Sequence, residues 1–226
     1  MKISPDPSKN PSKPKQGGDK QPYHHGDLRA ALLKAALLLI DRHGVKGFSL
    51  KDAAALAGVS TAAPYRHFAD KAAPLYALQG EGFALFNASL AAAFARGETA
   101  SSKIVEMGVA YVRFAMQHPA HFRVMFGLTG GSEAGNSPEP DPSRASGFLL
   151  LVEAVTAFLP RVEPAVRNDL VIAAWSLVHG FAWLQIESAF EGTVAMGDVE
   201  SQLRRTITLT LQQAGAGQSM DSPGNT

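Results

Sequence analysis

The chain has 226 residues, a hydrophobic content of 46% and a formal net charge of +1, which is typical of an ordinary folded protein with one or two domains. It contains no cysteine, and this excludes disulfides, thiolate metal sites and thiol nucleophiles. The chain does not begin with an apolar stretch, and no apolar run reaches about 18 residues, so we expect a cytoplasmic protein with no secretory signal and no membrane-spanning helix.

Charge is distributed unevenly along the chain. The first 90 residues carry 12 Lys and Arg against 7 Asp and Glu, whereas the rest carry 9 against 13. A basic N-terminal part suits a DNA-binding surface. Five of its lysines, however, lie in residues 1–22, which are rich in Lys, Pro, Ser and Gly and too poor in apolar residues to fold. We predict that this segment is a disordered basic tail, which either contacts phosphates or only keeps the chain soluble.

The first predicted helix runs from Leu28 to His43, where apolar residues recur at helical spacing. Asp27 is a good N-cap for this helix, and Gly44 is a good stop. The adjacent His24 and His25 precede it beside the tail. We expect them to face solvent or phosphate rather than to bind a metal ion.

Two short helices are predicted next, around a glycine turn. Ser49 can cap the helix Leu50–Ala57, and Gly58 can end it because glycine adopts a left-handed conformation without strain. Ser60 can cap the second helix, Thr61–Phe68. Two short helices joined by a tight turn that contains glycine predict a helix-turn-helix.

The spacing of this segment resembles the DNA-binding domain of the TetR family of transcriptional repressors. The family pattern runs roughly A-x-x-A-G-V-S-x-G-T-L-Y-x-H-F-x-x-K, and the chain reads AALAGVSTAAPYRHFADK from Ala54. The matching positions are Ala54, Ala57, Gly58, Val59, Ser60, Tyr65, His67, Phe68 and Lys71. The chain departs from the pattern at Ala62, Ala63 and Pro64, so a polar contact usual at position 63 is missing. The resemblance covers about residues 24–80 well and the rest in outline.

The resemblance implies that residues 23–70 form a three-helix domain, with Phe48 and Phe68 in its core, that binds double-stranded operator DNA. Lys71 is expected to contact a phosphate at the start of the fourth helix. Arg66 is suited to reading guanine, but it can instead face solvent or pair with Asp70. The predicted DNA contacts are Ser49, Ser60, Thr61, Ala62, Ala63, Tyr65, Arg66, His67 and Lys71, of which Thr61, Ala62 and Arg66 are placed to reach base edges.

Residues 71–213 are predicted to form a larger helical domain, followed by a disordered tail at 214–226. Gly80 and Gly82 either soften the first helix of this domain into a hinge or allow close packing. Residues 128–146 are rich in Gly and Pro, and we expect a disordered loop there. The predicted helices are Lys71–Arg96 with Asp70 as its cap, 101–118 with Ser101 or Ser102 as its cap, Ala120–Gly127, Gly147–Leu159, Pro164–Phe190 and, capped by Asp198, Val199–Gln213.

The helix Pro164–Phe190 is the most apolar one, and we expect it to be buried on several sides. Trp175, His179 and Gly180 in it form W-x-x-x-H-G, which is similar to the ligand-binding half of one TetR branch. Trp175 and His179 share a face, and either contact a ligand or pack in the core. His118 and His121 are three residues apart, and we expect structural or pocket roles for them rather than a metal site. The predicted apolar pocket is drawn from Phe83, Phe86, Tyr111, Phe114, His118, Phe122, Met125, Trp175, His179 and Trp183.

These features predict an all-α, ligand-responsive DNA-binding regulator. The resemblance implies a repressor that a small apolar or amphipathic molecule releases from its operator. We expect a homodimer joined by a bundle of Pro164–Phe190 and Val199–Gln213 from each chain, with no metal and no cofactor. One alternative is an enzyme that uses His179, but no catalytic set accompanies this residue in the sequence. The other is a helical protein-binding adaptor that does not bind DNA, which would leave Tyr65 and Lys71 of the motif unexplained.

Overall fold

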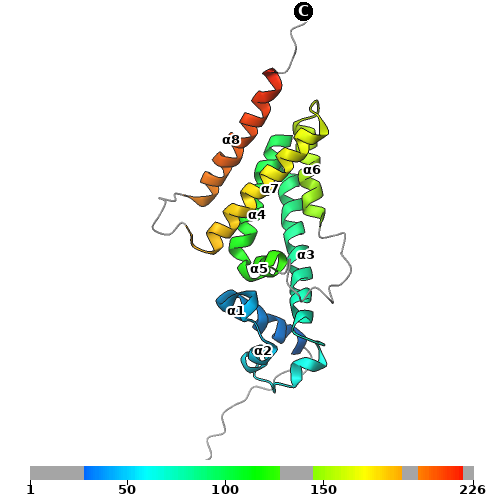
Figure 1. Ribbon diagram of the computed structural model, residues 1–226, viewed down its shortest axis with the longest axis vertical. Helices are drawn as coiled ribbons and strands as arrows, with labels where there is room; N and C mark the ends of the chain where they lie inside the picture. Colours follow the sequence, from blue (N-terminus) through cyan, green and yellow to red (C-terminus); the bar gives the residue numbers. More distant parts are fainter. Residues whose placement is uncertain (1–27, 128–144, 190–197, 221–226) are drawn as a thin grey trace, which may run out of the picture.

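The computed structural model describes residues 28–127, 145–189 and 198–220. Within these ranges the chain forms eight α-helices, one short 3-10 helix and no strand, which confirms the all-α prediction. The molecule is elongated, with α1 (Leu28–Gly47) and α2 (Leu50–Leu56) at one end and the longer helices stacked beyond them (Figure 1). Predictions for the basic tail, the two adjacent histidines, the Asp27 cap and most of the loop after residue 127 lie outside the described residues.

The N-terminal core is built from α1, α2 and the segments that follow them. Phe48 is 1% exposed and Phe68 is 3% exposed, and both pack in one cluster with α1. This confirms their predicted place in the core. The helical path of α1 breaks at Gly44, where φ is 69° and ψ is 173°, so the predicted stop is confirmed although helical hydrogen bonding resumes as far as Gly47.

The helix-turn-helix differs from the prediction in its second helix. The Ser49 hydroxyl accepts the Asp52 N–H at 3.1 Å and caps α2, and Gly58 takes a left-handed φ of 71°, as expected. The predicted helix Thr61–Phe68 is wrong, because only the 3-10 helix η1 (Ala63–Arg66) forms. Its Pro64 has no N–H to donate. The side chain of Ser60 does not cap it, and the Ser60 carbonyl instead accepts the Ala63 N–H at 3.0 Å.

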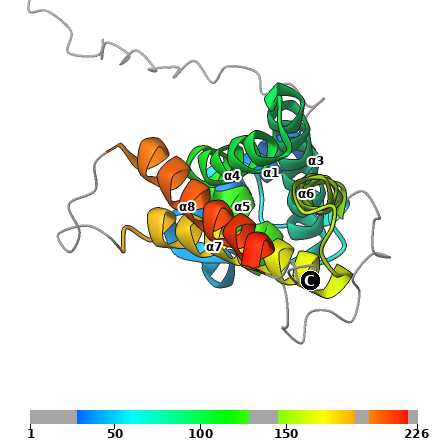
Figure 2. The same cartoon turned by 90° about the horizontal axis from the view of Figure 1, so that it is seen from above.

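The C-terminal part is organised around α4 (Ala100–Gln117). This helix packs against α3 (Ala72–Arg96), α5 (Pro119–Gly127), α6 (Ser146–Phe158), α7 (Pro164–Ile186) and α8 (Val199–Met220). Viewed along the long axis, α4 lies between α8 and α3 (Figure 2). Nine of its residues are buried. Eight of these nine, all but Gly108, belong to a single core cluster with the facing sides of the surrounding helices.

The ends of these helices show where local signals are decisive. The Asp70 carboxylate accepts the N–H groups of Ala72 and Ala73, both at 2.9 Å, so α3 is capped as predicted but begins one residue after Lys71. The predicted cap of α4 is wrong. Thr99 is the N-cap, and its hydroxyl and that of Ser102 form a reciprocal capping box.

The last helix begins as predicted but ends later. Asp198 accepts the Ser201 N–H at 3.0 Å, which confirms it as the cap of α8. The helix continues to Met220, seven residues past the predicted end at Gln213, so the tail predicted from residue 214 is helical over its first half. Predictions for the final six residues lie outside the described ranges.

The two glycines of α3 differ in their surroundings. A Cβ added at Gly82 would meet the Sδ atom of Met125 at 2.8 Å and its Cγ atom at 2.9 Å, whereas one added at Gly80 would meet nothing within 4 Å. Gly82 therefore allows α3 and α5 to approach closely. Of the two roles considered from sequence, close packing is the one that applies at Gly82.

The apolar helix α7 is less buried than predicted. Its buried residues are Leu170, Val171, Val178 and Ala182, whereas Ile172 is 58% exposed. By length and composition alone α7 is apolar enough to cross a membrane, and 22% of its apolar window is buried. The expectation of burial on several sides is therefore wrong for a single chain. A broad apolar face of α7, which includes Ile172 and Leu184, is not covered by the described part of the chain.

Candidate functional site

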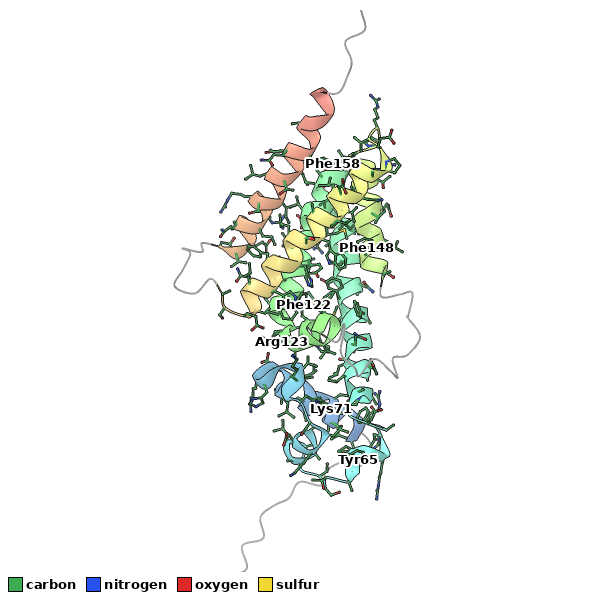
Figure 3. All side chains as sticks on the ribbon, in the orientation of Figure 1. Tyr65, Lys71, Phe122, Arg123, Phe148 and Phe158 are labelled. Atoms are coloured by element: carbon green, nitrogen blue, oxygen red, sulfur yellow. The ribbon has the colours of Figure 1, made fainter. Side chains whose placement is uncertain are left out.

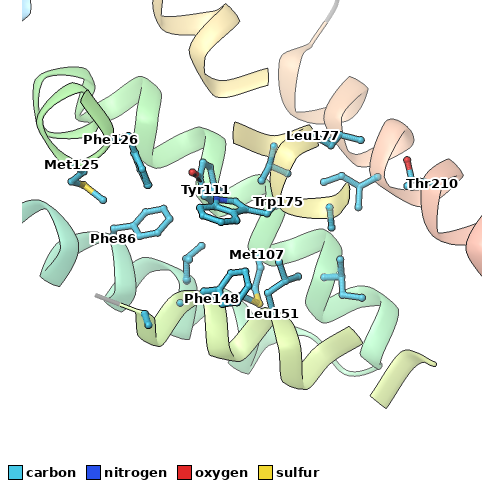
Figure 4. A pocket seen from close by; sticks show the side chains of 18 of the residues that line it. Phe86, Met107, Tyr111, Met125, Phe126, Phe148, Leu151, Trp175, Leu177 and Thr210 are labelled. Carbon is cyan, nitrogen blue, oxygen red and sulfur yellow. Dashed lines mark hydrogen bonds between the residues drawn. The ribbon is translucent and has the colours of Figure 1, made fainter. Parts of the chain in front are cut away.

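A cavity of about 450 Å³ lies in the C-terminal part, between helices that are distant in sequence. Figure 4 shows Phe86 from α3, Tyr111 from α4 and Trp175 from α7 turned toward the same space. Its walls are almost entirely hydrocarbon and aromatic. Within the described ranges, no Asp, Glu, Lys, Arg or His belongs to the lining. A concave, apolar space of this size with few polar groups is typical of a small-molecule site.

Half of the predicted pocket residues line the cavity. These are Phe83, Phe86, Tyr111, Met125 and Trp175. The other five are not on its wall, and this part of the prediction is corrected: Phe114, His118, Phe122, His179 and Trp183. Phe114 and Phe122 are 3% and 0% exposed because they fill the core between α3, α4 and α5. His118 packs beside Phe114, with a distance of 5.0 Å between their ring centroids.

Several lining residues were missed by the sequence interpretation. They come mainly from α6 and α8, which were assigned no pocket role, and from the first half of α4. The spacing of Met107 from Tyr111, and of Ile207 from Leu211, places each pair on one helical face and is a usable signal. The missed residues include Leu90, Ile104, Met107, Phe126, Phe148, Leu151, Leu177, Val178, Ile207, Thr210 and Leu211.

Two glycines bring α8 and α6 close to the cavity. A Cβ at Gly108 would collide with the Ile207 side chain, and it would lie 3.2 Å from Val178 Cγ1. A Cβ at Gly147 would lie 2.6 Å from Leu90 Cδ1. The small residues therefore determine how tightly the surrounding helices close over the space.

A polar chain runs along one side of the cavity. The Trp183 indole N–H donates to Nε2 of His179 at 3.0 Å, and Nδ1 of His179 lies 2.7 Å from the Tyr111 hydroxyl oxygen. That oxygen also accepts the Trp175 indole N–H at 3.4 Å. Burial lowers the pKa of His179, which favours the neutral ring, and burial raises the pKa of Tyr111, which keeps the phenol protonated. Both His179 nitrogens are thus engaged, and its role is to hold Tyr111.

The predicted DNA contacts gather at the opposite end of the molecule, where Figure 3 labels Tyr65 and Lys71. Tyr65 is 61% exposed, and Ser60, Thr61, Ala62, Arg66 and His67 are exposed as well. Ala63 and Lys71 are partly buried. The Ser49 hydroxyl is committed to the cap of α2. No salt bridge between Arg66 and Asp70 is found within the described part of the chain, since the Asp70 carboxylate caps α3 instead.

Helix α5 connects the N-terminal core to the cavity. Its Ala120 and Val124 are buried in the N-terminal core, whereas Phe122 and Met125 are buried in the C-terminal core. Because Met125 also lines the cavity, one short helix contacts both regions. The N-terminal core therefore extends beyond the boundary predicted at residue 70.

Arg123 of α5 adds a polar link between the same regions. Its guanidinium donates to Glu187 Oε1 at 3.0 Å, at the end of α7, and lies 3.4 Å from Asp41 Oδ1 in α1. It also donates to the Ile186 carbonyl at 3.3 Å. The Arg123 side chain is 15% exposed, so these contacts are partly shielded from water. The arrangement joins α1, α5 and α7 at one point (Figure 3).

Comparisons with known proteins give matches along most of the chain. Residues 32–76 match the family model described as bacterial regulatory proteins, tetR family, and residues 104–210 match the one described as tetracyclin repressor-like, C-terminal domain. No curated protein sequence matches.

Solved structures with a similar fold include a protein of unknown function from Rhodococcus sp. RHA1, at 29% identity, a TM-score of 0.65 and coverage of 86% of this chain and 98% of that one. A regulatory protein of the tetR family from Rhodococcus RHA1 has 21% identity, a TM-score of 0.63 and coverage of 82% and 96%. A TetR family transcription regulator from Marinobacter aquaeolei VT8 has 22% identity, a TM-score of 0.57 and coverage of 83% and 93%.

Proposed function

Because the chain belongs to the TetR family of transcriptional regulators, we propose that it is a homodimeric repressor that leaves its operator when a small apolar or amphipathic molecule occupies the cavity. The observation that carries this proposal is the position of α5. Met125 lines the cavity, and one residue before it Val124 packs in the core that holds the helix-turn-helix.

The mechanism we propose is a shift between two conformations. A molecule that fits the cavity better in one of them favours that conformation, in which the two DNA-binding ends of the dimer are wrongly spaced for successive major grooves. Contact of α5 with both cores gives a physical route for this coupling. The Arg123 link to Asp41 and Glu187 would be strained or relieved by the same motion.

The proposed dimer rests on exposed apolar surface. Ile172 and Leu184 of α7 are 58% and 44% exposed, and Leu209 of α8 is 58% exposed. A second copy of α7 and α8 would cover these residues in a four-helix bundle. Sedimentation of a stable monomer at micromolar concentration would contradict this part of the proposal.

We propose further that the protein is not an enzyme and acts in the cytoplasm, where its operator lies. The enzyme alternative depended on His179, and both nitrogens of this residue are committed to Tyr111 and Trp183. A gel shift with DNA from upstream of its own coding region tests the main function. A specific shift supports the regulator, whereas no binding to any operator candidate supports the adaptor alternative.

A further inference from the structure

Tyr111 lines the cavity, and its hydroxyl is joined to His179 and Trp175 by hydrogen bonds. We propose that the cavity binds an uncharged, largely hydrocarbon molecule through one hydrogen-bond acceptor, such as a carbonyl or ether oxygen, that receives the hydroxyl hydrogen of Tyr111. This inference rests on the proposed function, because it describes what the same cavity recognises.

The direction of the hydrogen bonds follows from Trp183. An indole N–H can only donate, so Nε2 of His179, at 3.0 Å, must accept. A neutral imidazole carries one hydrogen, which is therefore on Nδ1. At 2.7 Å, Nδ1 donates this hydrogen to the hydroxyl oxygen of Tyr111. The pKa of His179, which burial lowers, agrees with a neutral ring, since an imidazolium would place two donors face to face at Trp183.

Tyr111 is then saturated as an acceptor and open as a donor. Its oxygen accepts one hydrogen from His179 and another from the Trp175 indole at 3.4 Å, which occupies both lone pairs. No acceptor for the hydroxyl hydrogen is found in the part of the chain that the structure describes. Tyr111 is 5% exposed and lines the cavity, so the unused hydrogen is withheld from bulk water. A buried donor without a partner is costly, and a ligand oxygen would satisfy it.

The remaining wall explains why the ligand should be uncharged. Among the residues that the structure describes, no ionisable side chain other than the Tyr111 phenol lines the cavity to compensate a carboxylate or an ammonium group, whose transfer from water is expensive. The hydroxyl of Thr210 donates to the Thr206 carbonyl at 3.0 Å, so its hydrogen is not available. The Trp175 N–H is used on Tyr111. Tyr111 is thus the hydrogen-bond donor that the described wall offers to a ligand (Figure 4).

The test compares three naphthalene probes of similar shape by calorimetric titration of the full chain. They are 2-acetylnaphthalene, which has a carbonyl, 2-isopropenylnaphthalene, which has a methylene group instead, and the anion 2-naphthoate. We expect the wild-type protein to bind the ketone roughly tenfold more tightly than the alkene, which is the effect of one ordinary hydrogen bond, and naphthoate more weakly than the ketone. Tyr111→Phe combined with Trp175→Phe, which also removes the indole N–H that loss of the Tyr111 oxygen would free, should remove the preference for the ketone. Thr210→Val, a matched loss of a hydroxyl from the same wall, should keep it.

The outcomes separate this inference from the proposed function. Equal affinity of the wild type for ketone and alkene, or tightest binding of naphthoate, would overturn the role of Tyr111 while the cavity remained a ligand site. Failure of all three probes to bind a chain that still shifts operator DNA would remove the ligand-binding function itself. Nitrogen-15 NMR of the unliganded wild type provides a test that needs no variant. Protonation of His179 at Nδ1 is expected, and protonation at Nε2 would overturn the hydrogen-bond direction.

Discussion

The paired glycines of α3 allow a sharp test of how α3 packs on α5. Gly80→Ala places a methyl group where nothing lies within 4 Å, so it should act only through helix propensity and stabilise the protein by about 1 kcal/mol. Gly82→Ala brings the same gain in propensity, but its methyl group would meet Met125 Sδ at 2.8 Å and Cγ at 2.9 Å. Met125 is 2% exposed and has little room to retreat.

Overpacking of a filled core costs roughly 1–3 kcal/mol, so we expect Gly82→Ala to be neutral or to destabilise the protein by about 2 kcal/mol. The expected difference between the two variants is about 1–3 kcal/mol, which corresponds to several degrees in the midpoint of thermal unfolding for a chain of this length. Chemical denaturation of both variants, followed by circular dichroism, measures it. If Gly82→Ala were stabilised as much as Gly80→Ala, our account of close packing at Gly82 would be wrong. Loss of operator binding or ligand response in Gly80→Ala alone would instead identify Gly80 as a hinge.

Three further predictions concern DNA, the dimer and pH. Lys71→Ala should weaken binding to all DNA alike and reduce the slope of log binding constant against log salt concentration by about 0.9 per dimer half. Arg66→Ala should reduce the binding free energy by about 1–3 kcal/mol on the operator and by little on random DNA. Equal losses on both DNAs would make Arg66 a phosphate contact. Ile172→Glu should convert the proposed dimer to monomer in sedimentation. Leu85→Glu, at an α3 position that is 43% exposed, should not change the oligomeric state. A stable Ile172→Glu dimer would exclude α7 from the interface. Burial lowers the pKa values of His121 and His179 below 6.5, so the unfolded chain binds more protons than the folded one. The free energy of unfolding should therefore fall as the pH drops from 7 to 5. An unfolding free energy from urea titrations that does not change over this pH range would contradict this.

Local signals predicted several parts of the fold well. The caps at Ser49, Asp70 and Asp198, the turn at Gly58 and the core role of Phe48 each depend on chemistry within a few residues, and all are confirmed. The errors also have local physical causes. Thr99 was overlooked as a cap because several hydroxyl residues stand in succession there, and Pro64 disfavours the full helix that was predicted from the Ser60 cap.

The cavity was harder to predict because its shape is decided by tertiary packing. The spacing of Trp175 and His179 indicated a shared face, but only the neighbouring helices determine that Trp175 reaches the cavity while His179 stands behind Tyr111. The spacing of Ile207 and Leu211 marks a shared face of α8, but that this face reaches the cavity depends on the close approach at Gly108, which helical periodicity does not show. Exposure of Ile172 is likewise invisible to sequence, since apolar residues that face a partner chain and those that face a core look the same.

The dual packing of α5 also constrains how such regulators can be recombined. A chimera that joined residues 1–98 to the ligand-binding domain of another protein would lose Ala120 and Val124, which are 7% and 0% exposed. The core of its DNA-binding domain, in which both residues are packed, would then be partly exposed to water. A transplanted module would therefore need α5 from the same parent. The C-terminal domain would then also need to accommodate Phe122 and Met125 from that parent in its core. The two domains are therefore expected to be exchangeable together with α5, but not by a junction within α3.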